Sequence, residues 1–212
     1  AIENHNGDFV LVGATESQDV DISKPRGSYD FWVIKINATG DLIWERSIGG
    51  SDYDSASSII ETLSGEYLIA GQSYSQDIDV LNPQGSSDIL LAWISQEGVL
   101  RKTKNLGHQG FETVNQLVQR SDGTLLAIGH STSSFISQDQ ENQLNNDVRL
   151  VHTLPNGSEI SSDTLSGEGL NIGESLTTSA DGKIIVVGST ESTSGNFSNS
   201  NSHSGFSLLP QS

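Results

Sequence analysis

The residues best suited to bind a ligand are aspartates that recur in two matching loops. Each loop carries the string Ser-Gln-Asp-x-Asp and reaches a further Asp nine residues later. Carboxylates two residues apart point to the same side of an extended segment. Calcium takes about six to eight oxygen ligands in flexible geometry, whereas Asp in a loop also accepts backbone N–H groups and caps turns. Both alternatives are open for the candidate metal ligands, which are Asp19, Asp21, Asp30, Asp77, Asp79 and Asp88.

A second group of residues could bind an organic ligand or a cation. Asp54 lies in a Gly-rich link, and Glu112 and Glu174 lie near the equivalent positions of later repeat units. A ring of such carboxylates could hold a cation or a sugar, or could simply be solvated. Trp44 is the aromatic candidate, because exposed indole faces suit carbohydrate, although interior packing would also explain an indole. The candidate ligand-binding residues are therefore Asp54, Glu112, Glu174 and Trp44.

No residue pattern indicates an enzyme. The chain has no Cys, which excludes disulfides, thiolate metal sites and thiol nucleophiles. Its five His residues lack the paired spacing of zinc ligands, and no Gly-x-Ser-x-Gly nucleophile elbow is present. The sequence therefore predicts a protein without catalytic activity. The enzymatic alternative is a pair of carboxylates that only the fold brings together, as in glycoside hydrolases.

The charge of the chain excludes some partners. The net charge is −17, and only ten Lys and Arg are spread over 212 residues. This balance argues against nucleic acid as a partner and against binding to anionic membranes. No apolar stretch approaches the roughly 18 residues that a membrane span needs. An acidic surface favours solubility and cation binding.

An internal repeat decides where these residues lie. A Gly-flanked apolar run recurs every 58 or 59 residues. A second apolar run follows in every unit, after an Asp in three units and after a Gly in the last. A shared register over so many features indicates a repeat architecture. The first runs begin at Gly7, Gly65, Gly123 and Gly182, and the second runs follow Asp30, Asp88, Asp147 and Gly205.

Each unit is predicted to form four short strands. The first is expected over 57–62, with equivalents over 115–119 and 175–178, and the second is the Gly-flanked run. The third is expected over 31–36 and its equivalents. The second run is apolar at four consecutive positions, which indicates burial on both faces. The fourth strand, over 42–48, alternates, as a half-exposed outer strand does.

Buried inner strands and a solvent-exposed outer strand are typical of a propeller blade. We therefore predict an all-β fold, a β-propeller of four-stranded antiparallel blades of about 58 residues. One domain over 1–212 would hold blades at roughly 1–52, 53–110, 111–170 and 171–212, the last incomplete. Because Ala1–Glu3 aligns with Ile59–Glu61, the chain is expected to begin inside a strand and to form part of a larger propeller.

The repeat resembles a known class of sequences. The resemblance rests on the strings Tyr29–Ile36, Ala38–Asp41, Ile48–Ser51 and Gly65–Gly71. It is to the β-propeller repeats of large secreted or cell-surface bacterial proteins, including proteins with type IX secretion signals, and it covers all four units. The resemblance implies a propeller and export. It implies no single activity, since such repeats occur in adhesins and in enzyme appendages alike.

These observations predict an extracellular or cell-surface binding module, structural or adhesive, with a protein or glycan ligand and with calcium as a candidate stabiliser. One alternative is a carbohydrate-binding module appended to a secreted polysaccharide-acting enzyme. Another is an enzyme with a carboxylate site at the propeller mouth. Because exposed sheet edges pair readily, association through open blade edges is also expected.

Overall fold

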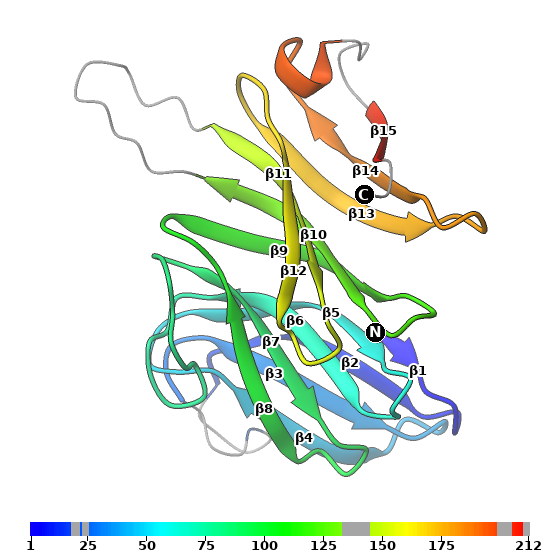
Figure 1. The fold of residues 1–212 in the computed structure, drawn as a ribbon. Coiled ribbons are helices and arrows are strands. Elements are labelled where there is room, and N and C mark those ends of the chain that lie inside the picture. The colour runs from blue at the N-terminus through cyan, green and yellow to red at the C-terminus, as the bar shows by residue number, and fades with distance from the viewer. Residues whose placement is uncertain (18–21, 23–25, 133–144, 199–204, 210–212) are drawn as a thin grey trace. The chain divides into compact units, whose positions relative to one another are not determined.

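The computed structural model describes residues 1–17, 22, 26–132, 145–198 and 205–209, the last segment as backbone only. It divides into two compact units, Ala1–His108 and Gln109–Ser212 (Figure 1). The described residues form antiparallel sheets, and their helical content is one 3-10 turn, η1 (Gly195–Phe197). The predicted all-β class is confirmed. No helix in the described residues is long and apolar enough to cross a bilayer.

The first unit contains two sheets, each a chain of consecutive hairpins. In both sheets the strands lie in sequence order, and every pair is antiparallel. Sheet A consists of β1 (Ile2–Glu3), β2 (Phe9–Thr15), β3 (Asp30–Ile36) and β4 (Leu42–Ile48). Sheet B consists of β5 (Asp54–Glu61), β6 (Tyr67–Ser73), β7 (Asp88–Ile94) and β8 (Leu100–Leu106).

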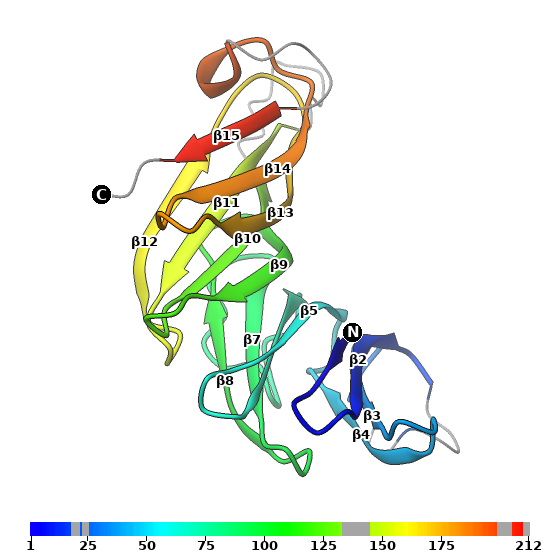
Figure 2. The ribbon, with the colours of Figure 1, turned by 90° about the vertical axis from the view of Figure 1, so that its right-hand side faces the viewer.

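The second unit repeats this plan (Figure 2). Sheet C consists of β9 (Phe111–Gln119), β10 (Leu125–Thr132), β11 (Asn146–Thr153) and β12 (Glu159–Leu165). Sheet D consists of β13 (Asn171–Thr178), β14 (Ile184–Thr190) and β15 (Gly205–Leu209). A Gly in the turn between the first and second strands allows the chain to reverse: Gly65 has φ +80° and donates its N–H to Thr62 O at 2.8 Å.

The first strands of sheets B, C and D begin earlier than the sequence predicted, at Asp54, Phe111 and Asn171. A β-bulge divides each of these strands, because one residue is skipped in the pairing with the next strand. A bulge shifts the alternation of side chains by one residue. The first half of the strand therefore does not continue the alternating pattern of the second half, and the sequence predicts only the second half. The skipped residues are Ser57, Asn115 and Glu174.

Within each unit the sheets pack face to face around an apolar layer. We call the face of sheet B that carries Tyr67 and Ile69 its front face, and use the same name for the equivalent face of every sheet. In the first unit the back face of sheet A, with Val10 and Val33, packs on the front face of sheet B. In the second unit the back face of sheet C packs on the front face of sheet D, which carries Val186.

Candidate functional site

The predicted acidic residues of the first unit meet at one end of its strands. The loop end comprises the β4–β5 link, the β6–β7 loop and the described residues just before β3. In a sheet of four consecutive antiparallel strands, the loop between the second and third strands lies at the same end as the link that leaves the fourth strand. The repeat therefore places these segments together. Asp30, Asp54, Asp77, Asp79 and Asp88 all lie here, and Asp19 and Asp21 lie outside the described residues.

Asp54 opens β5 and is fully buried. Its carboxylate accepts hydrogen bonds from Ser73 Oγ, from Ser75 Oγ at 2.8 Å and from the Gly50 N–H at 2.7 Å. Burial raises the pKa of the Asp54 carboxyl, since the hydrogen bonds offset only part of the desolvation. The Asp54 side chain therefore joins the β4–β5 link to β6 and to the residues that follow β6.

The equivalent residue of sheet D supports this structural role. Asn171 is also fully buried, at the first position of β13. Its Oδ1 accepts a hydrogen bond from Thr190 Oγ1 at 2.5 Å, and its Nδ2 donates to Gly167 O at 3.3 Å. An amide thus does in sheet D what a carboxylate does in sheet B. A negative charge is not needed for this tie.

Asp30 and Asp88 each open a third strand and are almost fully buried. Asp30 Oδ2 accepts the Arg26 N–H at 2.7 Å, and burial raises the pKa of the Asp30 carboxyl. Asp88 accepts the N–H groups of Gln84 and Gly85 at 2.7 and 3.2 Å. Both carboxylates close the loop that leads into their own strand, which is the turn-capping arrangement.

Asp77 and Asp79 fold the β6–β7 loop onto the β4–β5 link. Asp77 Oδ1 accepts the Ser51 N–H at 2.8 Å. Asp79 Oδ2 lies 3.1 Å from Arg26 Nη2 and accepts the Gly49 N–H at 3.4 Å. Among the described residues, no three or more His, Asp and Glu side chains are grouped so that they could hold a metal ion.

The two glutamates predicted as ligand-binding residues differ in their surroundings. Glu112 lies at the position equivalent to Asp54, is buried, and pairs with Arg149 Nη1 at 3.2 Å. Glu174 is the bulge residue of β13 and is exposed. Its charge acts on His130, whose pKa is lowered by burial and only partly restored by Glu174. The two glutamates therefore do not line one carboxylate ring.

Trp44 is half-buried and holds the two sheets of the first unit together. Its Nε1 donates to Gln96 O at 3.0 Å, and its ring lies 6.2 Å from the ring of Tyr67. The indole packs against the apolar cluster between sheets A and B and covers the turn at Gly98. This geometry favours interior packing over ligand stacking for Trp44.

Three tyrosines form a cluster at the loop end that the sequence did not predict. The ring of Tyr53 lies 5.4 Å from that of Tyr29 and 5.9 Å from that of Tyr74. Backbone hydrogen bonds fix all three segments, since Asp54 N–H donates to Tyr29 O and Tyr74 N–H donates to Tyr53 O. Tyr53 is 41% exposed, and the other two rings are half-buried. We call Tyr29, Tyr53 and Tyr74 the tyrosine cluster.

Polar groups border the tyrosine cluster. The exposed Glu16 carboxylate is hydrogen-bonded to Tyr29 and raises the pKa of its hydroxyl. Gln72 Nε2 donates to Tyr74 Oη at 3.0 Å and to Ser87 Oγ at 3.2 Å. Only four tyrosines occur in the chain, and two of them stand directly before a buried Asp, in Tyr29-Asp30 and Tyr53-Asp54. That repeated pair was the available sequence signal.

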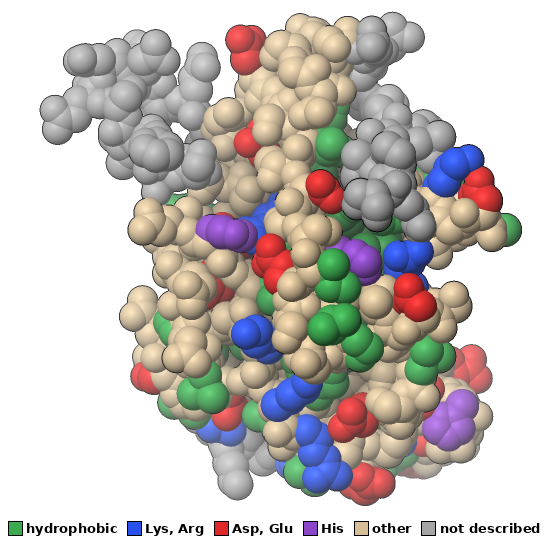
Figure 3. Space-filling model, in the orientation of Figure 1, with side chains coloured by type: hydrophobic (Ala, Val, Ile, Leu, Met, Phe, Trp, Pro, Cys, Tyr) green, Lys and Arg blue, Asp and Glu red, His purple; other side chains and the backbone are tan. Residues whose placement is uncertain are grey.

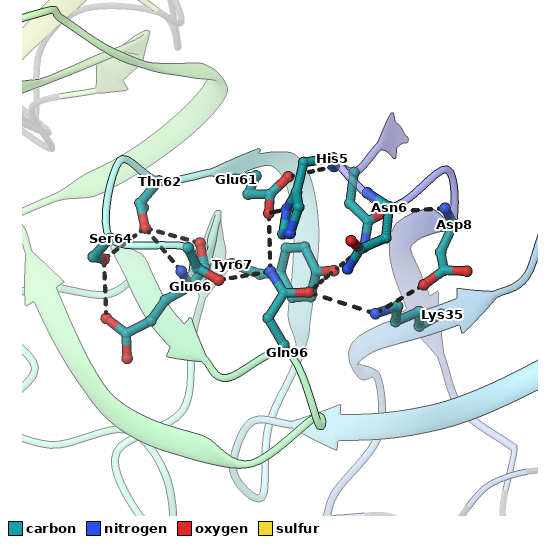
Figure 4. A network of polar contacts seen from close by, with 12 residues as sticks. His5, Asn6, Asp8, Lys35, Glu61, Thr62, Ser64, Glu66, Tyr67 and Gln96 are labelled. Atoms are coloured by element: carbon teal, nitrogen blue, oxygen red, sulfur yellow. Dashed lines mark hydrogen bonds and ion pairs between the residues drawn. The ribbon is translucent and has the colours of Figure 1, made fainter.

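The opposite, hairpin end of the first unit carries a polar network that joins its two sheets (Figure 4). The Tyr67 hydroxyl, fully buried, accepts from Asn4 Nδ2 at 2.8 Å and donates to Gln96 Oε1 at 2.6 Å. Gln96 Nε2 donates to Glu61 Oε1 at 3.0 Å, and Glu61 also pairs with His5. These groups satisfy one another, as a structural network requires.

Lys35 belongs to the same network. It is 6% exposed, and its Nζ lies 3.1 Å from Asp8 Oδ2 and 5.7 Å from the centre of the Tyr67 ring. Burial acts to lower the pKa of the Lys35 ammonium, but hydrogen bonding to Asp8 and Tyr67 outweighs burial and raises it. The lysine therefore stays charged and paired, which fits a structural role at the hairpin end.

Comparison with known proteins identifies no family. No family model and no curated protein matches the chain. Among solved structures, a protein of unknown function from Bacteroides caccae is similar, with 15% sequence identity and a TM-score of 0.43. The similarity covers 75% of this chain and 47% of that one, so the chain spans about half of its length. The resemblance to secreted propeller repeats stays a prediction.

Proposed function

We propose that this chain is a non-catalytic extracellular binding module, built from the blades of a β-propeller, which contacts a glycan through the tyrosine cluster. The exposed ring of Tyr53, held between Tyr29 and Tyr74, carries this proposal. Tyrosine combines a rigid apolar ring with a hydroxyl, which suits a ligand with apolar faces and polar edges. A sugar ring has both, since its C–H groups form a face and its hydroxyls form the rim.

The surroundings of the cluster suit a neutral or basic sugar rather than an acidic one. Glu16 supplies a carboxylate acceptor at one side, and the amide of Gln72 and the hydroxyl of Ser87 lie at the other. Ligand sites commonly combine aromatic surface with a few placed polar groups. The carboxylates that could have supported glycoside hydrolysis are engaged in the fold: Asp54 ties the link, and Glu112 pairs with Arg149.

Changing Tyr53 to Ala should lower glycan affinity at least about tenfold, because a central tyrosine commonly contributes more than 1.4 kcal/mol to binding. A glycan array finds the ligand, and titration calorimetry with the best glycan measures the loss. Leu63→Ala is the control, since Leu63 is 72% exposed and follows the opposite end of β5. Equal affinity of Tyr53→Ala and the unchanged chain would refute the proposed site.

We also propose that Asp30, Asp77, Asp79 and Asp88 stabilise the loop end as turn caps and do not require calcium. Each accepts at least one backbone N–H. Asp88→Asn, which leaves a single acceptor oxygen, should cost about 1 kcal/mol of stability. The unchanged chain should have the same melting temperature in excess calcium as in chelator. The loss of stability caused by Asp88→Asn should also be the same in both conditions. A rise with calcium that disappears in Asp77→Asn, Asp79→Asn would restore the calcium alternative.

A further inference from the structure

A carboxylate lies directly beside the aromatic surface of the tyrosine cluster. The Tyr29 hydroxyl donates a hydrogen bond to the exposed carboxylate of Glu16, and the Tyr29 ring lies 5.4 Å from the ring of Tyr53. A phenol that donates to a carboxylate has a more electron-rich ring, because negative charge on its oxygen spreads into the π system. Since the faces of aromatic rings attract cations, Glu16 strengthens the attraction of this surface for a positive group.

The rings of the tyrosine cluster are inclined to one another. The plane of the Tyr53 ring makes an angle of 49° with that of Tyr29 and of 78° with that of Tyr74. Inclined rings present their faces in more than one direction, which suits a rounded ammonium group better than a flat group stacked on a single face. Tyr53, the central ring, is also the most exposed of the three. A ligand therefore reaches the middle of the cluster from solvent.

The other exposed charges of the loop end are acidic as well. Asp52, which directly precedes Tyr53, and Asp77 in the β6–β7 loop are both exposed. Arg26 is the one basic side chain among the described residues of the loop end, and its Nη2 lies 3.1 Å from Asp79 Oδ2. That guanidinium is therefore neutralised within the fold. Because an excess of one sign of charge attracts the opposite sign, the loop end attracts cations and repels anions.

We infer that the tyrosine cluster binds a glycan that carries a free amino group, with the ammonium group of the sugar against the Tyr53 ring and beside Glu16. This inference rests on the proposed glycan site and narrows its ligand to one class, the amino sugars that are not acetylated. The ammonium group donates to the Glu16 carboxylate, while the C–H groups of the sugar contact the ring of Tyr53. An acetamido group in the same place carries no charge and gains neither the ion pair nor the cation–π contact.

A matched pair of oligosaccharides tests this inference. Oligomers of glucosamine and of N-acetylglucosamine of equal length differ only in the ammonium and acetamido groups. Titration calorimetry in mildly acidic buffer, which keeps the amines protonated, should give the glucosamine oligomer an affinity at least about tenfold higher. Added salt should reduce this difference, because salt screens exposed charges. Equal affinities, or a preference for the acetylated oligomer, would overturn the inference.

Glu16→Gln tests the role of the carboxylate in the same assay. The amide keeps an oxygen that accepts from the Tyr29 hydroxyl but loses the negative charge. The preference for the glucosamine oligomer over the acetylated oligomer should therefore fall about fivefold. Circular dichroism should be unchanged, because Glu16 is exposed and the Tyr29 backbone is held by the Asp54 N–H at 2.7 Å. An undiminished preference in Glu16→Gln would contradict the inference.

General attraction by an acidic chain is the alternative explanation that a control must exclude. The net charge is −17, and Figure 3 shows acidic side chains spread among Lys, Arg and other polar ones over the face that it draws. Glu97→Gln removes the same charge as Glu16→Gln, but from the β7–β8 turn at the hairpin end, where Glu97 is exposed. It should leave the preference for the glucosamine oligomer unchanged. Equal losses in the two variants would refute a local site for the ammonium group.

The inference and the proposed glycan site fail in different ways. A neutral glycan that loses its affinity in Tyr53→Ala, without any preference for the glucosamine oligomer, would keep the site and overturn the inference. A chain that binds neither oligomer would also overturn the inference, while the glycan array still decides the proposed site. Binding of the glucosamine oligomer that is equal in Tyr53→Ala and in the unchanged chain would overturn both, because the ammonium group would then lie elsewhere.

Discussion

Replacing Arg149 by Met should lower the free energy of unfolding by about 3–5 kcal/mol, because the change leaves the carboxylate of Glu112 buried without its counter-ion. Arg149 and Glu112 are 4% and 2% exposed, and Arg149 Nη1 lies 3.2 Å from Glu112 Oε1. Arg149 also donates from Nε to Ser162 Oγ at 3.2 Å. The guanidinium therefore joins β9, β11 and β12, and a charge at this depth has little access to water.

Urea denaturation followed by circular dichroism measures this loss. The double variant Glu112→Leu, Arg149→Met is the control, because it removes both charges and keeps apolar volume. Replacement of a buried ion pair by apolar residues is often neutral or stabilising, so the double variant should regain most of the stability. A single Arg149→Met variant within about 1 kcal/mol of the unchanged chain would contradict the buried-pair account.

Gly71→Ala should cost about 2–4 kcal/mol, because overpacking a rigid site forces the backbone to shift. A β-carbon at Gly71 would overlap the carbonyl oxygen of Ser55, lie 2.7 Å from Ala56 Cα and lie 2.5 Å from Phe31 Cζ. Two of these atoms belong to the bulged backbone of β5, which cannot rotate away as a side chain can. The bulge thus explains the Gly at the end of the apolar run in sheets B, C and D, where a β-carbon at Gly71, Gly129 or Gly188 would meet the backbone of the bulged strand.

Gly13→Ala is the matched control, at the same repeat position in sheet A. A β-carbon at Gly13 would have no atom within 4 Å among the described residues, because β1 covers only Ile2–Glu3. The stability of this variant should change by less than about 1 kcal/mol. Thermal melts of both variants decide the matter. Equal effects at the two glycines would mean that the bulge does not set the requirement.

The sequence could predict the sheets because their signal is local. Four apolar runs between glycines, in one register, require inner strands that are buried on both faces. The all-β class followed from this pattern and is confirmed. The starts of the first strands could not be read in this way, because the bulges at Ser57, Asn115 and Glu174 interrupt the alternation on which the reading depends.

The roles of the polar residues depended on the tertiary structure. The sequence determined that Asp54 and Glu112 stand at equivalent positions, but not that one meets two serine hydroxyls while the other meets a guanidinium. It gave three tyrosines far apart in the chain, and the loop end brings their rings into contact. Periodicity along a chain records which side of its own strand a residue faces. It does not record which group from another strand or loop lies opposite, and that neighbour decides whether a carboxylate caps a turn, pairs with a cation or meets a ligand.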